Sequence, residues 1–97
     1  MTAQKTERYQ GWANWATWNV VLWVGNDEPI YRAMQLHKSR LPAKAFSAHQ
    51  AEEFVRTRMP RGTPDMREEK KGKGTDARFS VYRDVNWIEV ARSFNEE

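Results

Sequence analysis

Cysteine is absent from the 97 residues of this sequence. Disulfide bonds, zinc sites built on thiolates and thiol nucleophiles are therefore excluded, and the chain suits a reducing compartment. No apolar run approaches the roughly 20 residues that a membrane helix needs. The polar start, MTAQKTERYQ, also lacks the apolar core of a signal peptide. We expect a protein that stays in the cytoplasm of the cell in which it is made.

The chain also has little excess charge of either sign. Its 16 basic and 13 acidic residues leave a formal charge of +3. A dedicated phosphate-binding protein usually concentrates its basic residues in one element, whereas here the signs are mixed. Nucleic acid is permitted by this composition but not indicated. A chain of this length forms one domain with a modest core, so its function is to be sought on the surface.

Tryptophan is abundant, and three of the five tryptophans lie between Asn14 and Asn26. At roughly 100° per residue, a helix over this stretch is apolar nearly all round, which predicts a central, buried helix. Asn14 is expected to cap its start, and the Gly25-Asn26 pair to end it in the left-handed conformation. The side chains that we place in the core are Trp15, Trp18, Val21, Leu22 and Trp87, with Val20 and Val24 on the opposite side of the helix.

A β-strand buried on both faces is the alternative for this stretch, because its Val, Leu and Trp residues also suit a sheet. The capping residues and the i, i+3, i+7 spacing of Trp15, Trp18 and Leu22 favour the helix.

A second helix is predicted to begin after Asp27 and to run to about Arg40. Asp27 is a good N-cap, and Pro29 fits a first turn, where its missing N–H has no intrahelical partner. His37 lies on the apolar stripe of this helix, and core packing explains it adequately.

Two more helices have clear start signals. Ser47 with Gln50 forms a capping box that opens a helix to about Met59. Asn86 with Glu89 three residues later opens the final helix in the same way.

Residues 1–11 are polar and end at Gly11, which predicts a flexible arm. Residues 60–77 are predicted to form a mobile basic loop, because Pro, Gly and mixed charge dominate there. Residues 79–82 alternate as a short extended segment would. We therefore predict a mainly α fold, a compact bundle of about four helices around the Trp-rich helix. It forms a single domain over residues 12–97, with at most one short strand or hairpin.

Three motifs stand out in the chain. They are NWATWNV (14–20) continued by LWVGNDE (22–28), the turn Thr63-Pro64-Asp65, and VNWIEVA (85–91). Together they resemble a family of small proteins from phages, plasmids and other mobile elements, with the pattern N-[YW]-x-T-W-N-V-x-L-W-[IV]-x-N-D-E. The resemblance carries no activity to any residue. It implies a mobile-element origin, and with it a role in modulating host machinery, as anti-restriction and anti-CRISPR inhibitors do. The KKGKG insertion at 70–74 does not fit the family pattern.

Catalytic and metal-binding patterns are missing from the sequence. No serine lies in a nucleophile motif, and the glycines form no phosphate-binding loop. His37 and His49 have no second histidine at i+3 or i+4, and the acidic pairs have ordinary places at a helix start, on a solvated face and in a loop. We expect a non-enzymatic protein with no metal, cofactor or small-molecule substrate.

Asn19 is the polar residue most enclosed by apolar neighbours. If it is buried, its amide must be hydrogen-bonded, most cheaply to a backbone terminus of another element. A structural clamp is the favoured interpretation over a ligand contact.

The candidate partner contacts are two tryptophans on the flank of the Trp-rich helix and the basic residues between 56 and 83. Exposed tryptophans and arginines are enriched at binding hot spots. The basic region is either a solvated loop or a flexible arm that contacts phosphates or an acidic protein groove. The residues predicted to bind the partner are Trp12, Trp23, Arg56, Arg58, Arg61, Lys70, Lys71, Lys73, Arg78 and Arg83.

The function predicted from these observations is that of a small binding protein that sterically blocks a host protein or ribonucleoprotein complex handling nucleic acid. The alternative is direct binding of nucleic acid by the basic 56–83 region.

Overall fold

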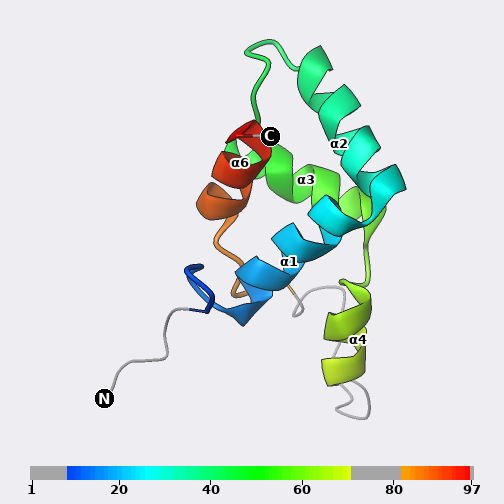
Figure 1. Cartoon of the computed structure of the whole chain (residues 1–97), viewed down its shortest axis with the longest axis vertical. Helices are drawn as coiled ribbons and strands as arrows, with labels where there is room; N and C mark the ends of the chain where they lie inside the picture. The colour runs from blue at the N-terminus through cyan, green and yellow to red at the C-terminus, as the bar shows by residue number, and fades with distance from the viewer. Residues whose placement is uncertain (1–8, 71–81, 97) are drawn as a thin grey trace.

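The computed structural model of the chain describes residues 9–70 and 82–96. Within these ranges the elements are α1 (Trp15–Asn26), α2 (Glu28–Arg40), α3 (Ala48–Arg58), α4 (Pro64–Lys70) and α6 (Trp87–Glu96). Helix α1 crosses the centre of the molecule, with α2, α3 and α6 above it and α4 below (Figure 1). Helix α6 packs against α1 and α3, and α1 packs against α2. The predicted mainly helical, compact bundle is confirmed.

Helix α1 begins as predicted but ends differently. The side chain of Asn14 accepts a hydrogen bond from Thr17 N, which makes it the N-cap. Gly25 and Asn26 do not adopt the left-handed conformation, since both lie inside the helix. The chain turns at Asp27 instead, whose N–H donates to Trp23 O at 3.1 Å and whose carboxylate accepts from Ile30 N at 3.2 Å. One residue therefore ends α1 and caps α2, with no linker between them.

The buried face of α1 is the one opposite to that predicted. Thr17, Val20 and Val24 share a face at i, i+3, i+7 spacing and are at most 1% exposed. The predicted core residues of this helix, Trp15, Trp18, Val21 and Leu22, are all only half-buried. Because both faces are apolar, helical periodicity cannot choose between them. The face with the smaller side chains lies inward, and the tryptophans cover its edges.

The starts of the other predicted helices are confirmed. Asp27 caps α2, and Ser47 with Gln50 forms a complete capping box at α3. At α6 the side chain of Asn86 accepts a hydrogen bond from Glu89 N at 3.1 Å. Local capping chemistry determined where these helices begin.

An aromatic cluster holds α2, α3 and α6 together. Phe46, on the loop between α2 and α3, has its ring centroid 5.2 Å from that of Phe94 and 5.9 Å from that of Phe54. The His37 ring stacks on Phe46 at 5.5 Å and keeps an exposed face. Asn95 fixes the loop by accepting from Phe46 N at 2.7 Å and donating to Phe46 O at 3.0 Å. His37 was predicted to pack in the core; it contacts the core rings from the edge but is itself exposed.

The predicted loop at 60–77 contains a helix, α4. Thr63 is fully buried, and its hydroxyl accepts from Met66 N at 3.1 Å, so it acts as the N-cap. Pro64 occupies the first helical position, where proline is favoured. The start signals of this helix are present in the sequence, but the glycines and charges that follow them obscured it. The loop prediction for residues 71–77 lies outside the described residues.

Tyr82 returns the chain to the core. Its side chain is 1% exposed, and its hydroxyl donates to Met59 O at 2.5 Å. Burial raises the pKa of this phenol above its ordinary value. Tyr82 belongs to a turn, and the rest of the predicted extended segment, 79–81, is not among the described residues.

The predicted flexible arm is ordered at its end. Tyr9 and Trp12 exchange backbone hydrogen bonds of 2.8 and 2.7 Å across Gln10 and Gly11, which have φ values of 52° and 86°. Two successive positive φ angles are typical of a type I′ turn. The Tyr9 ring lies 4.9 Å from that of Trp18 and covers part of it. Residues 1–8 of the predicted arm lie outside the described residues.

Candidate partner-binding site

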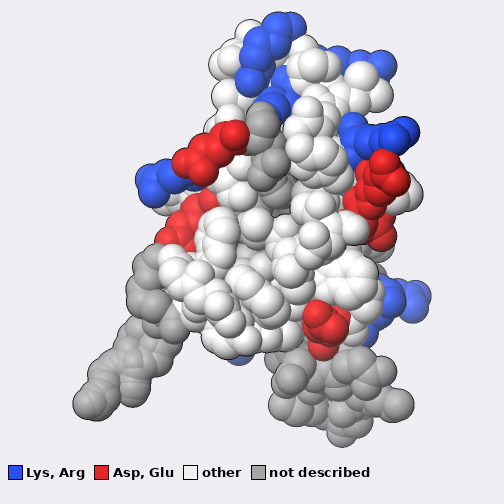
Figure 2. All heavy atoms as spheres, viewed as in Figure 1, with Lys and Arg blue, Asp and Glu red and all other residues white. Residues whose placement is uncertain are grey.

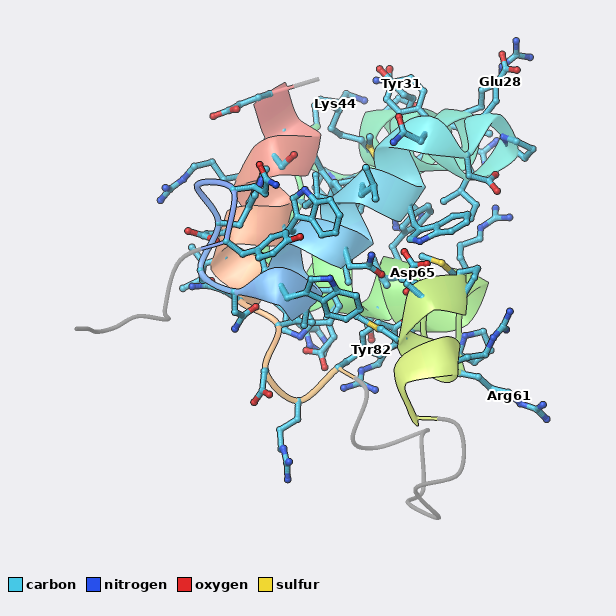
Figure 3. All side chains as sticks on the ribbon, turned by 60° about the horizontal axis from the view of Figure 1, so that its bottom comes forward. Glu28, Tyr31, Lys44, Arg61, Asp65 and Tyr82 are labelled. Carbon is cyan, nitrogen blue, oxygen red and sulfur yellow. The ribbon has the colours of Figure 1, made fainter. Side chains whose placement is uncertain are left out.

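The first motif and the Thr63-Pro64-Asp65 turn are joined by a polar cluster. Asn19 is fully buried; its amide oxygen accepts from the Thr63 hydroxyl and its Nδ2 donates to Asp65 Oδ2 at 2.8 Å. The Trp23 indole donates to the same Asp65 oxygen at 2.9 Å. These two hydrogen bonds hold the pKa of Asp65 below its ordinary value, and the bond from Asn19 has the larger effect. Asp65 lies at the start of α4, facing α1 (Figure 3).

The first and third motifs are joined by a second cluster. Thr17 Oγ1 donates to Asn14 Oδ1 at 2.7 Å and accepts from Asn86 N at 2.9 Å. Glu89 accepts a hydrogen bond from Ala13 N at 2.8 Å. Glu89 therefore bonds the chain before α1, whereas in a capping box its carboxylate would bond Asn86 N.

These two clusters account for most of the polar motif residues, which hydrogen-bond within the fold: Asn14, Thr17, Asn19, Thr63, Asp65, Asn86 and Glu89. The clamp predicted at Asn19 exists, although its partners are side chains of Thr63 and Asp65 and not a backbone terminus. A buried amide that already has both kinds of partner has little capacity left for a ligand. A binding site must therefore be sought outside the motifs.

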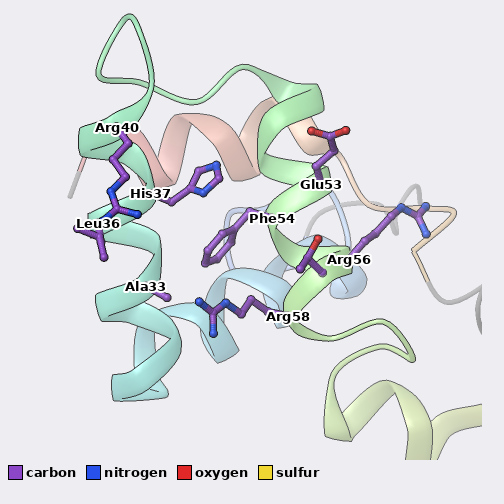
Figure 4. A pocket seen from close by; sticks show the side chains of 9 residues that line it. Ala33, Leu36, His37, Arg40, Glu53, Phe54, Arg56 and Arg58 are labelled. Atoms are coloured by element: carbon purple, nitrogen blue, oxygen red, sulfur yellow. The ribbon is translucent and has the colours of Figure 1, made fainter.

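A groove of about 650 Å³ lies between α2 and α3. Its floor is Phe54, its α2 wall carries Ala33 and Leu36, and Leu36 is 53% exposed (Figure 4). The complete lining is Ala33, Leu36, His37, Arg40, Glu53, Phe54, Arg56, Thr57 and Arg58.

The arginines of the groove differ in their surroundings. Arg56 is paired with Glu52 at 2.8 Å, lies 5.2 Å from the Tyr82 ring and extends away from the groove (Figure 4). Arg58 extends from α3 toward α2, 5.8 Å from the ring of Phe54, and Arg40 lies on the α2 side. Neither Arg40 nor Arg58 has an ion-pair partner among residues 9–67 and 82–96.

A second hollow of about 210 Å³ adjoins the groove at Arg58. Trp23, Pro60 and Pro64 contribute to its lining, as do Arg61 and Arg67. Arg61 points outward beside α4 (Figure 3), and neither of these two arginines has an ion-pair partner in the described part of the chain. We call Arg40, Arg58, Arg61 and Arg67 the arginine edge.

The predicted partner contacts are only partly brought together. Arg58 and Arg61 belong to the arginine edge, and Trp23 lines the hollow beside them with its indole N–H already bonded. Trp12 lies elsewhere, in a hollow of about 420 Å³ with Trp18, Leu22 and Tyr31. On the face of the molecule seen in Figure 2, the middle has little charge. Arg83 is exposed near the start of α6, whereas Lys71, Lys73, Arg78 and the side chain of Lys70 lie outside the described residues.

Arg40 was not among the predicted contacts, and Arg67 was included only as one of the basic residues between 56 and 83. Arg40 sits in the last turn of α2, where a cation is expected to stabilise the helix dipole. Arg40 lies beside Phe54 because of how α2 packs across α3, and the residues next to Arg40 in the sequence do not predict that packing. Arg67 was assigned to a loop because α4 was missed.

Other kinds of site find little support among the described residues. They contain no group of three or more His, Cys, Asp or Glu side chains that could hold a metal ion. No helix in this part of the chain has the length and apolar character needed to cross a membrane.

Comparison with known proteins identifies a family whose function is unknown. The profile of a family described as being of unknown function matches residues 5–93. No curated protein matches the chain. No solved structure matches it either.

Proposed function

The chain belongs to that family, DUF7249, and we propose that it is a non-enzymatic binding protein of phage or mobile-element origin. It acts in the cytoplasm of the host cell as an anti-defence inhibitor of the anti-CRISPR or anti-restriction type. It covers a surface of a host complex that handles nucleic acid and so blocks that complex sterically.

The arginine edge is the observation that carries this proposal. Four guanidinium groups without ion-pair partners among the described residues lie beside apolar hollows containing Phe54, Leu36 and Trp23. Arginine next to aromatic and aliphatic groups is typical of protein interfaces, because its planar fork binds carboxylates while its stem packs on apolar surface. The buried polar side chains of the motifs, Thr17, Asn19 and Thr63, are by contrast hydrogen-bonded within the fold.

The test is protection of phage from host defence. The chain is expressed in bacterial strains that each carry one restriction or CRISPR system, and the plating efficiency of a targeted phage is measured. We expect plating to rise in at least one strain, and the rise to be lost when Arg40, Arg58, Arg61 and Arg67 are all changed to Glu. The control is Arg92→Glu, an exposed arginine on α6 outside the edge. Unchanged plating in every strain would contradict the proposal.

Direct binding of nucleic acid is the second candidate, and the four arginines of the arginine edge, with the exposed Arg83, favour it. Phosphate contacts release counterions, so this function requires an affinity for DNA or RNA that falls steeply as salt is raised. Substitution of Lys70, Lys71 and Lys73 should weaken it further. Absent or salt-insensitive binding in a filter-binding titration would eliminate this candidate.

A further inference from the structure

The groove between α2 and α3 resembles a space that one more helix would fill. Its floor, Phe54, is 6% exposed, while Leu36 on the wall is 53% exposed. Ala33 and Arg40 mark its extent along α2; seven residues of helix correspond to about 10 Å, or two helical turns. We infer that this groove binds an acidic amphipathic helix of the partner protein. The inference rests on the proposed binding function and names the chemistry of the partner.

The charges of the groove favour an acidic occupant. Arg40 and Arg58 lie on its two walls without ion-pair partners in the described chain, and Phe54 lies between them (Figure 4). Glu53 lines the groove but extends away from its centre (Figure 4). A helix lying along Phe54 could present one carboxylate to each arginine, in the bidentate geometry that guanidinium favours.

The apolar part of the groove selects the form of the occupant. A helix presents apolar side chains at i, i+3 or i+4, and i+7 along one stripe, which spans the same two turns as Ala33 to Arg40. Leu36 and Phe54 would contact that stripe. A nucleic acid strand would use Arg40 and Arg58 but would leave Leu36 in water.

A second copy of this chain complements the groove poorly. Ile88 of α6 is 64% exposed and could supply an apolar contact. However, Arg92 follows it at i+4 on the same face of α6. Self-docking would bring a third arginine toward Arg40 and Arg58, so the acidic helix of a different protein is the better occupant.

Selection of peptides from a library tests whether the groove binds an acidic helix, and it does not require the partner to be known. A phage-displayed library of helical peptides, randomised at surface positions, is panned against the full chain, and enriched peptides are measured by fluorescence anisotropy. We expect enriched peptides to carry an apolar stripe flanked by Asp or Glu. Leu36→Glu should weaken their binding by about tenfold or more, as expected for an interface hot spot. Ile88→Glu, which places the same charge on an exposed apolar site of α6, should leave binding unchanged.

Reversing the charge of the two groove arginines is an independent test of the inference. The double variant Arg40→Glu/Arg58→Glu should lose the acidic peptide and gain the matched peptide in which Glu is replaced by Lys. Enrichment of basic peptides, no enrichment, or equal losses in Leu36→Glu and Ile88→Glu would overturn the inference. Two further results would also overturn it. One is that single-stranded DNA displaces the peptides and binds the Leu36→Glu variant as well as it binds the parent. The other is that the chain forms a dimer in solution and that Leu36→Glu abolishes the dimer.

The two proposals can fail separately. If the chain protects phage but selects no acidic helix, only the identity of the groove's occupant is wrong. If acidic helices are selected and phage plating never changes, the groove stands as a binding site and the anti-defence function fails.

Discussion

Trp23 and Asp65, 42 residues apart in the sequence, are joined by a hydrogen bond of 2.9 Å from the indole Nε1 to the carboxylate Oδ2. Asn19 donates to the same oxygen at 2.8 Å. The bond fixes α4 against α1 and leaves the Trp23 ring beside Arg58 and Arg61. A residue that looked like a recognition contact thus positions part of the arginine edge.

Asn19→Ala tests the buried clamp. The substitution removes the acceptor of the Thr63 hydroxyl and one of the two donors to Asp65, so we expect the free energy of unfolding to fall by about 2–4 kcal/mol. Urea denaturation followed by circular dichroism measures it. Asn26→Ala, at an exposed site of the same helix, is the control, and equal effects of the two substitutions would argue against the clamp.

Asp65 makes the stability depend on pH. Its pKa is lowered from 3.8 in the folded state. The stability that it contributes is therefore fully present above the unfolded pKa and is lost as the pH falls below about 4 through the folded value. In melting experiments between pH 7 and pH 2.5, Asp65→Asn should be less stable than the parent near neutrality, with the difference shrinking in acid. A constant difference across this range would show that the carboxylate charge is not involved.

Thr17→Val tests the link between the first and third motifs. Valine keeps the shape but removes the hydroxyl that accepts from Asn86 N and donates to Asn14. We expect a loss of about 1–3 kcal/mol, since Asn86 N is left without its partner. Thr57→Val on α3, which is exposed, should change stability far less. Equal losses would mean that valine's intrinsic cost in a helix is the cause.

Alanine substitution should change the stability in opposite directions at Gly25, inside α1, and at Gly11, in the turn before α1. Gly25 lies within the helix with nothing within 4 Å of an added Cβ, so Gly25→Ala should stabilise the fold by about 0.5–1 kcal/mol. Gly11 has φ +86°, so Gly11→Ala should destabilise it by about 1 kcal/mol or more. Thermal and urea unfolding of both variants provide the comparison. Destabilisation by Gly25→Ala would indicate that α1 does not continue through that residue.

The clearest predictions from sequence were those that depend on neighbouring residues. Asn14, Asp27, Ser47 and Asn86 each begin a helix because a side-chain oxygen reaches a backbone N–H within the next three residues. Thr63 does the same for α4, and that helix could have been predicted from Thr63 and Pro64 had the following charges been given less weight.

Only the tertiary structure decided which face of α1 is buried and where the arginines meet. The sequence determined that α1 is a helix apolar on both sides, but the choice between Val20 and Trp18 as the inward residue depends on how α2 and α6 pack against it. Arg40 and Arg58 lie on different helices, and their common groove exists because α2 is anchored by Asp27 at one end and by the Phe46 loop at the other. Local physics fixed the elements, and packing between distant segments fixed the surface that they share.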